Sequence, residues 1–168
     1  SWVHRYSAHG EYVDSFGGLG NEPGKLKSPH GIKIDTRTGE ELVLVTDRGN
    51  RRLQYFTLSG EFIRLVAGVI RFPCTTIQWG EELYIPDLHS RLTVLDKNDG
   101  LVTHLGDWPG AWEQEGWPNF PREQWQEGKF SSPHDLHVDR AGNIYVAEWL
   151  SNGTGKLTKL VRQGALDL

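Results

Sequence analysis

Residues 28–35 read SPHGIKID and residues 42–63 read LVLVTDRGNRRLQYFTLSGEFI, and together they define a unit that recurs along the chain. The unit starts with Pro and His and continues through alternating apolar residues to a turn. A second apolar segment then ends at Asp47, and a third ends close to Gly60. Because alternation of apolar residues is typical of β-strands, the unit predicts short antiparallel strands.

Further copies of this unit follow the same order. The second copy comprises residues 72–79 (FPCTTIQW) and 82–102 (ELYIPDLHSRLTVLDKNDGLV). The third comprises residues 132–139 (SPHDLHVD) and 143–164 (NIYVAEWLSNGTGKLTKLVRQG). A partial copy, WVHRYSAHGEYV, occupies residues 2–13 and matches the end of the first unit. A period of about 40–50 residues with several short strands per unit is typical of propeller blades.

The spacing of equivalent positions locates an insertion. Cys74 and His134 are 60 residues apart, and Asp87 and Glu148 are 61 apart, so about 20 extra residues separate the last two copies. The repeat pattern disappears in residues 106–129, which therefore hold the insertion. We expect a partial blade at 2–16, blades near 28–66, 71–105 and 131–163, and a third copy that completes its outer strands by Arg162.

Composition restricts the classes of protein that remain. With 168 residues, 37% hydrophobic and 24% charged, the chain suits one folded domain and not a disordered segment. No apolar run approaches the roughly 18 residues of a membrane helix, so no membrane partner is expected. The single cysteine, Cys74, excludes an internal disulfide. No signal peptide is visible in the first residues, and a secreted or periplasmic location stays open.

Charge argues against nucleic acid as a partner. Residues 1–75 carry ten Lys/Arg against eight Asp/Glu, whereas residues 76–168 carry eight against fourteen. Proteins that bind nucleic acid usually show a clear basic excess, and this chain has a net charge of -4. No nucleic-acid partner is therefore expected.

The first unit resembles the NHL repeat, with Asp47, Gly49, Asn50, Arg52 and Leu53 at the positions of its core motif. The third copy is looser and the second most divergent. The resemblance covers nearly the whole chain except the insertion, and it implies an all-β, NHL-type β-propeller. About three and a half blades of a six-bladed ring are present.

Within such propellers, the phrase P-H-[GD]-[IL]-x-[IV]-D at His30 and His134 is similar to that of the peptidyl-α-hydroxyglycine α-amidating lyases. In that family such histidines point into the central channel and hold zinc, so the resemblance implies that His30 and His134 bind zinc or another divalent metal. The family uses three histidines and this chain shows two. Cys74 occupies the equivalent position between them, where it fits a small buried core residue better than a ligand.

Other residues are candidates for catalysis and substrate binding. His89 follows Asp87 in a loop that would face the channel mouth, where a histidine can act as acid or base. Arg48 could bind a carboxylate of a small substrate. The insertion carries Trp108, Trp112, Trp117 and Trp125, which either contact substrate or pack into a small core of their own.

The acids that end the second strand of each copy allow two interpretations. These acids are Asp47, Asp87 and Glu148. They could bind a cation or act as general bases in the channel. They could equally cap the following turn or pair with nearby arginines. Because every copy carries an acid here, the structural interpretation is favoured.

The function predicted is that of a metal-dependent propeller enzyme acting on a small polar substrate in the central channel, as a lyase by resemblance. A lactone or sugar hydrolase or isomerase is a second enzyme class. The alternative is a non-catalytic platform for protein or carbohydrate. Because propellers close with four to eight blades, the chain is a fragment, assembles with a second chain that supplies the missing blades, or forms an unusually small propeller.

Overall fold

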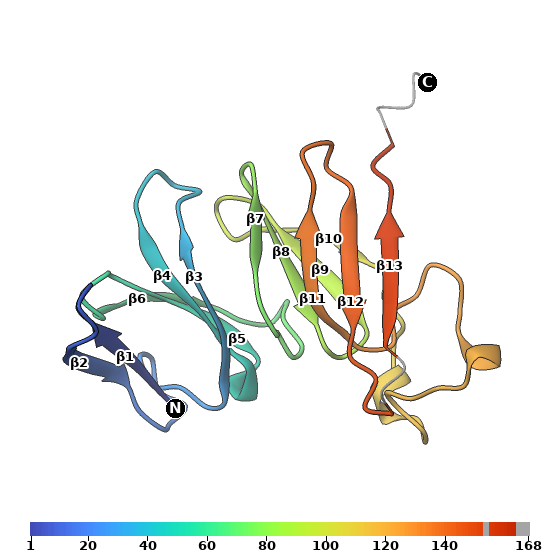
Figure 1. Ribbon diagram of the computed structural model, residues 1–168, viewed down its shortest axis with the longest axis horizontal. Helices are drawn as coiled ribbons and strands as arrows, with labels where there is room; N and C mark the ends of the chain where they lie inside the picture. The colour runs from blue at the N-terminus through green and yellow to red at the C-terminus, as the bar shows by residue number, and fades with distance from the viewer. Residues whose placement is uncertain (153–154, 164–168) are drawn as a thin grey trace.

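The computed structural model describes residues 1–152 and 155–163, which are built almost entirely of β-strands. Residues 153, 154 and 164, within the expected third copy, lie outside the described part. The strands form separate antiparallel sheets arranged side by side (Figure 1). No helix in the described ranges is long and apolar enough to cross a membrane.

Two of the sheets have four strands each, ordered as in the sequence. The first contains β3 (Pro29–Asp35), β4 (Leu42–Asp47), β5 (Arg52–Phe56) and β6 (Phe62–Val66). The second contains β7 (Ile77–Trp79), β8 (Glu82–Asp87), β9 (Arg91–Leu95) and β10 (Leu101–Leu105). Because neighbours in sequence pair within one sheet, each repeat unit forms one compact blade.

The remaining two sheets are smaller. β1 (Trp2–Tyr6) pairs with β2 (Tyr12–Gly17), and β11 (Pro133–Val138) precedes β12 (Ile144–Glu148) and β13 (Lys156–Leu160) in a three-stranded sheet. The expected completion of the third copy by Arg162 is not seen within the described residues, where its sheet ends at β13. Short 3₁₀ turns occupy Arg48–Asn50 (η1), Ala111–Glu113 (η2) and Arg122–Gln124 (η3).

The middle strands of the two central sheets are buried on both faces. All six residues of β4 are buried, which explains the continuous apolar run LVLV in place of simple alternation. Leu42 and Leu44 pack in a core shared with the second sheet, whereas Val43 and Val45 pack in a core with the first hairpin. A blade that is covered on each side by another blade produces this pattern, and the arrangement is that of part of a β-propeller.

Sheets at the two ends of the row lack a neighbour on one face. β12 alternates between buried and exposed residues, and β1 alternates between exposed and half-buried ones. Leu157 on β13 is 85% exposed and Tyr145 on β12 is 41% exposed. These faces have the composition of blade surfaces, although no other sheet within the described chain covers them.

A buried arginine joins the first two blades at their far ends. Arg37, in the turn after β3, donates to Asp35 and to the Tyr55 hydroxyl of its own sheet. It also forms an ion pair of 2.8 Å with Asp99, in the turn between β9 and β10. The network joins the first two blades at the ends opposite their strand starts.

Candidate metal centre

One end of each blade collects the residues singled out by the sequence. In an antiparallel blade, the start of the first strand lies at the same end as the turn between its second and third strands. The insertion of residues 106–129 enters the third blade from that end as well. In Figure 1 the turn η1 and the insertion both lie along the lower side of the row of sheets.

His30, Cys74 and His134 meet at this end. Each offers one ligand atom, and the three atoms lie within 4.8 Å of one another. The two imidazole rings are nearly perpendicular, with centroids 5.0 Å apart. The structure thus brings together two histidines that are far apart in sequence and adds Cys74, which the sequence placed in the core. Cys74 is indeed fully buried, and its sulfur belongs to the cluster.

Backbone contacts orient the cluster. His30 Nδ1 lies 2.9 Å from the carbonyl oxygen of Cys74, and as a donor to this oxygen it leaves Nε2 as the ligand nitrogen. The Thr46 hydroxyl donates to the same oxygen over 3.0 Å. The amide of Cys74 donates to the carbonyl of Pro86. Both sides of the Cys74 peptide are therefore held in place.

Burial sets the charge of the donors. It lowers the pKa of His134, and the electrostatic effects of the neighbouring His30 and Arg48 lower this pKa further. Burial also raises the pKa of the Cys74 thiol to about 11, against the opposing effect of Arg48. Near neutral pH, His134 is therefore an uncharged donor with a free lone pair, which is the state that binds metals.

Arg48 forms no ion pair with a carboxylate among residues 1–152 and 155–163. Its Nε is buried and donates no hydrogen bond within the part of the chain that the structure describes. Its guanidinium lies 5.1 Å from the centre of the Phe72 ring. The nearest repeat acid, Asp47, is already paired with Arg52. Binding of an anionic substrate group by Arg48 stays a prediction.

His89 lies inside an aromatic stack. Its ring is nearly parallel to Phe72 at 4.6 Å and to Trp112 at 5.3 Å, and Trp117 meets it edge-on at 5.9 Å. Burial lowers the pKa of His89, and the nearby Arg51 adds to this effect. Because Arg48 and His89 both stack on Phe72, this phenylalanine connects the two residues predicted to be catalytic.

The tryptophan-rich insertion packs largely on itself. Trp108 is 8% exposed and contacts Phe120 with ring centroids 5.1 Å apart, and Trp117 and Trp125 pack against the same cluster. The indole of Trp117 donates to the carbonyl of Ser131, just before β11. These contacts are those of a small core, and substrate binding by the four tryptophans stays a prediction.

The repeat acids are structural, as the favoured interpretation predicted. Each accepts a backbone amide from the segment that precedes the first strand of its blade: Lys27 to Asp47 (2.7 Å), Phe72 to Asp87 (2.8 Å) and Ser131 to Glu148 (2.6 Å). Each also pairs with a cation at the start of the third strand, namely Arg52, Arg91 and Lys156. None of these acids belongs to the His–Cys–His cluster.

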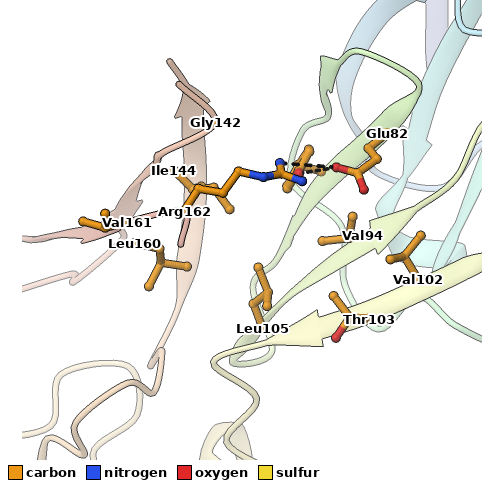
Figure 2. A pocket seen from close by; sticks show the side chains of 11 residues that line it. Glu82, Val94, Val102, Thr103, Leu105, Gly142, Ile144, Leu160, Val161 and Arg162 are labelled. Atoms are coloured by element: carbon orange, nitrogen blue, oxygen red, sulfur yellow. Dashed lines mark hydrogen bonds and ion pairs between the residues drawn. The ribbon is translucent and has the colours of Figure 1, made fainter. Parts of the chain in front are cut away.

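A larger cavity lies elsewhere and carries none of these groups. It has a volume of about 470 Å³ and lies between the second and third sheets (Figure 2). Its lining is mostly apolar, with Glu82 and Arg162 facing each other across 3.9 Å. The cavity is a gap between two blades, and none of the predicted site residues lines it.

Comparisons with known proteins support the fold alone. The chain is similar to hydrazine synthase of Kuenenia stuttgartiensis (TM-score 0.63, 9% identity, 95% of this chain and 40% of that one). It is similar to a catalytically inactive histidine-to-alanine variant of virginiamycin B lyase from Staphylococcus aureus (TM-score 0.60, 12% identity, 97% of this chain and 49% of that one). A candidate 6-phosphogluconolactonase of Bacteroides uniformis is also similar (TM-score 0.56, 13% identity, 93% of this chain and 49% of that one).

The chain thus spans less than half the length of each of these structures. No protein-family model matches it, and no curated protein matches it in sequence. The comparisons agree with the propeller arrangement of the sheets.

Proposed function

We propose that this protein is a metal-dependent propeller enzyme that acts on a small polar substrate at the central channel. The observation that carries the proposal is the cluster of His30, Cys74 and His134, whose ligand atoms lie within 4.8 Å of one another. Equivalent positions of radially arranged blades face a common axis, so such a cluster follows from the architecture. Imidazole and thiol donors suit zinc, cobalt or another metal of similar softness.

The donor atoms fit such an ion. In a tetrahedral zinc site, bond lengths of about 2.0 Å to nitrogen and 2.3 Å to sulfur place the ligand atoms about 3.5 Å apart. Closing the observed cluster therefore needs side-chain movements of about 1 Å or less. His30 is exposed, so one side of the site is open, as a catalytic site that keeps a position for water or substrate requires.

A bound metal would polarise a substrate oxygen or lower the pKa of a bound water. The protein supplies the other groups. Arg48, without a carboxylate partner in the described residues, binds an anionic group of the substrate such as a carboxylate. His89, kept neutral by burial, is available as a proton acceptor at the same end of the blades. Trp112 covers one face of His89 and restricts access of water to it.

Lyase chemistry of the amidating-lyase kind is the reaction class we favour, on an NHL-type six-bladed ring. The similarity of the Pro-His phrases at His30 and His134 supports it, and one structural neighbour is itself a lyase. Hydrolysis or isomerisation of a lactone or sugar is the second class, and a neighbour with a lactonase description agrees with it.

Further blades or a second chain would complete the ring. The outer face of the third sheet leaves Leu157 and Tyr145 exposed, and the first hairpin leaves Trp2 55% exposed. Apolar side chains on a sheet face of this kind need a partner surface. A binding platform without catalysis is less well supported, because the four tryptophans of the insertion are buried or half-buried.

Metal analysis of the purified protein tests this proposal. We expect one zinc-like ion per chain, and a rise in unfolding free energy of about 2.7 kcal/mol when free zinc is a hundred times its dissociation constant. The double variant His30→Ala, His134→Ala should lose both. His137→Ala is the matched control, because His137 is an exposed histidine on the same strand as His134. Absence of stoichiometric metal and of zinc stabilisation in the native protein would overturn the proposal.

A further inference from the structure

We propose that Cys74 is the third ligand of this centre: the metal replaces the proton of the Cys74 thiol, which is released to solvent, and binds the resulting thiolate in a His₂Cys donor set. The inference rests on the metal site proposed above and specifies its chemistry. It departs from the three histidines that the resemblance implies, since the described part of the chain brings only two to this point.

The position of Cys74 supports a ligand role. Cys74 stands at the start of the second blade, where His30 and His134 stand in the first and third, and all three ligand atoms share one site. A cysteine used only to fill a core would have its sulfur among apolar side chains. Here the sulfur lies within 4.8 Å of an imidazole nitrogen of each histidine.

The backbone around Cys74 directs its side chain. The Cys74 carbonyl accepts from both His30 and Thr46, and the Cys74 amide donates to Pro86. The bonds from His30 and Thr46 join the first two blades, the bond to Pro86 lies within the second blade, and together they hold the backbone of Cys74 on both sides. The Cys74 carbonyl orients the His30 ring, and the Cys74 thiol would bind the same metal as that ring. One residue therefore positions two of the donors.

Arg48 provides charge compensation for a buried thiolate. A buried anion needs a cation or hydrogen-bond donors nearby, and Arg48 acts electrostatically on both Cys74 and His134. Its buried Nε has no acceptor within the described residues. The repeat acids Asp47 and Asp87 pair with Arg52 and Arg91, and neither forms an ion pair with Arg48 in the described part of the chain.

A thiolate ligand has two chemical consequences. It makes the site selective for soft or borderline ions such as zinc, cobalt and cadmium over magnesium, calcium and manganese. It also reduces the net charge of a divalent centre by one unit compared with three neutral histidines. The metal alone then attracts an anionic substrate less strongly, and Arg48 restores positive charge on the side where Cys74 lies.

Cobalt spectroscopy tests the inference without an activity assay. Cobalt(II) bound to thiolate gives a sulfur-to-metal charge-transfer band in the near ultraviolet, in addition to the visible ligand-field bands of a tetrahedral ion. Because the chain has a single cysteine, such a band can come only from Cys74. We expect the reduced native protein to develop both sets of bands at one equivalent of cobalt.

Two variants sharpen the result. Cys74→Ser should lose the charge-transfer band and bind cobalt at least about a hundredfold more weakly, since loss of a direct ligand costs no less than loss of its supporting contacts. Cys74→His should bind cobalt without the near-ultraviolet band. Circular dichroism and cooperative unfolding show whether each variant folds, and the spectrum of the native protein stands without them.

The outcomes separate the two proposals. Tight cobalt binding with visible bands but no charge-transfer band, unchanged in Cys74→Ser, would overturn the thiolate inference and leave the histidine metal site standing. Failure of the native protein to bind cobalt or zinc would overturn both.

Discussion

Two sets of residues at equivalent repeat positions lie at the same end of the blades and make different kinds of contact. One set ends the second strand of each blade, and the other begins the first strand. The members of the two sets are Asp47, Asp87 and Glu148, and His30, Cys74 and His134. The acids each accept a backbone amide and pair with a cation of their own blade. The second set instead converges between blades.

The difference shows why recurrence alone does not identify a site. A residue type that every blade uses with the same partners supports the blade itself. The side chains at the strand starts vary between His and Cys, and their ligand atoms point to a place that no single blade contains. The two sets therefore differ in where their partners lie: the acids are paired within their own blade, and the His and Cys side chains meet between blades. Substitutions can test this difference.

The largest effect is expected from the acids. In Asp47→Ala, the buried guanidinium of Arg52 loses its carboxylate, and the amide of Lys27 loses its acceptor. Removing one partner of a buried ion pair costs about 3–5 kcal/mol, so urea unfolding should show a loss of that size. Glu40→Ala, at an exposed turn position, is the control and should change little. An Asp47→Ala protein as stable as the native one would show that the acid is not structural.

A smaller effect on stability is expected from the other set. In His30→Ala, an exposed side chain and one hydrogen bond to Cys74 are lost, so the unfolding free energy without metal should change by about 1 kcal/mol or less. Stabilisation by added zinc should nevertheless disappear, because a ligand is missing. Thermal unfolding with and without zinc measures both quantities. A large loss of stability together with retained zinc stabilisation would reverse the assignment of the two sets.

The smallest effect on stability is expected from His89, which belongs to neither set. Its lowered pKa means that the unfolded chain binds more protons than the folded protein below about pH 6.5, the ordinary value. The contribution of His89 is therefore complete above pH 6.5 and is lost as the pH falls toward its folded value. His89→Phe keeps the stack between Phe72 and Trp112 and removes this titration. The variant should lose less stability than the native protein on acidification, and parallel curves would contradict the stack as the cause.

Much of the fold could be predicted from local pattern. Alternating apolar residues, turns at Gly60 and Gly100 and the recurring acids all report on strand and turn geometry within about 40 residues. The same pattern could not show that Val43 and Leu44 face different cores, because both faces of β4 are covered by separate blades. Nor could it separate substrate contact from self-packing for Trp108, which depends on what the insertion folds against.

Cys74 as the third donor shows the same limit of prediction from local sequence pattern. Cys74 is as buried as a core cysteine, and from sequence its small apolar character favoured that role. Its signal was its register with His30 and His134, but register gives the position along a blade and not the direction of a side chain. No sequence pattern pointed to Phe72. Its ring contacts both Arg48 and His89, and these contacts arise only from the packing of the folded chain.

By itself, the sequence of this protein determined a repeating antiparallel unit, its length, the insertion and the pairs of residues that share a register. Those features depend on interactions between neighbours along the chain. Only the tertiary structure decided that Cys74 joins the two histidines from other blades and that the buried Nε of Arg48 has no hydrogen-bond partner within the described residues. Such contacts depend on how whole blades pack around an axis, and no local pattern encodes that packing.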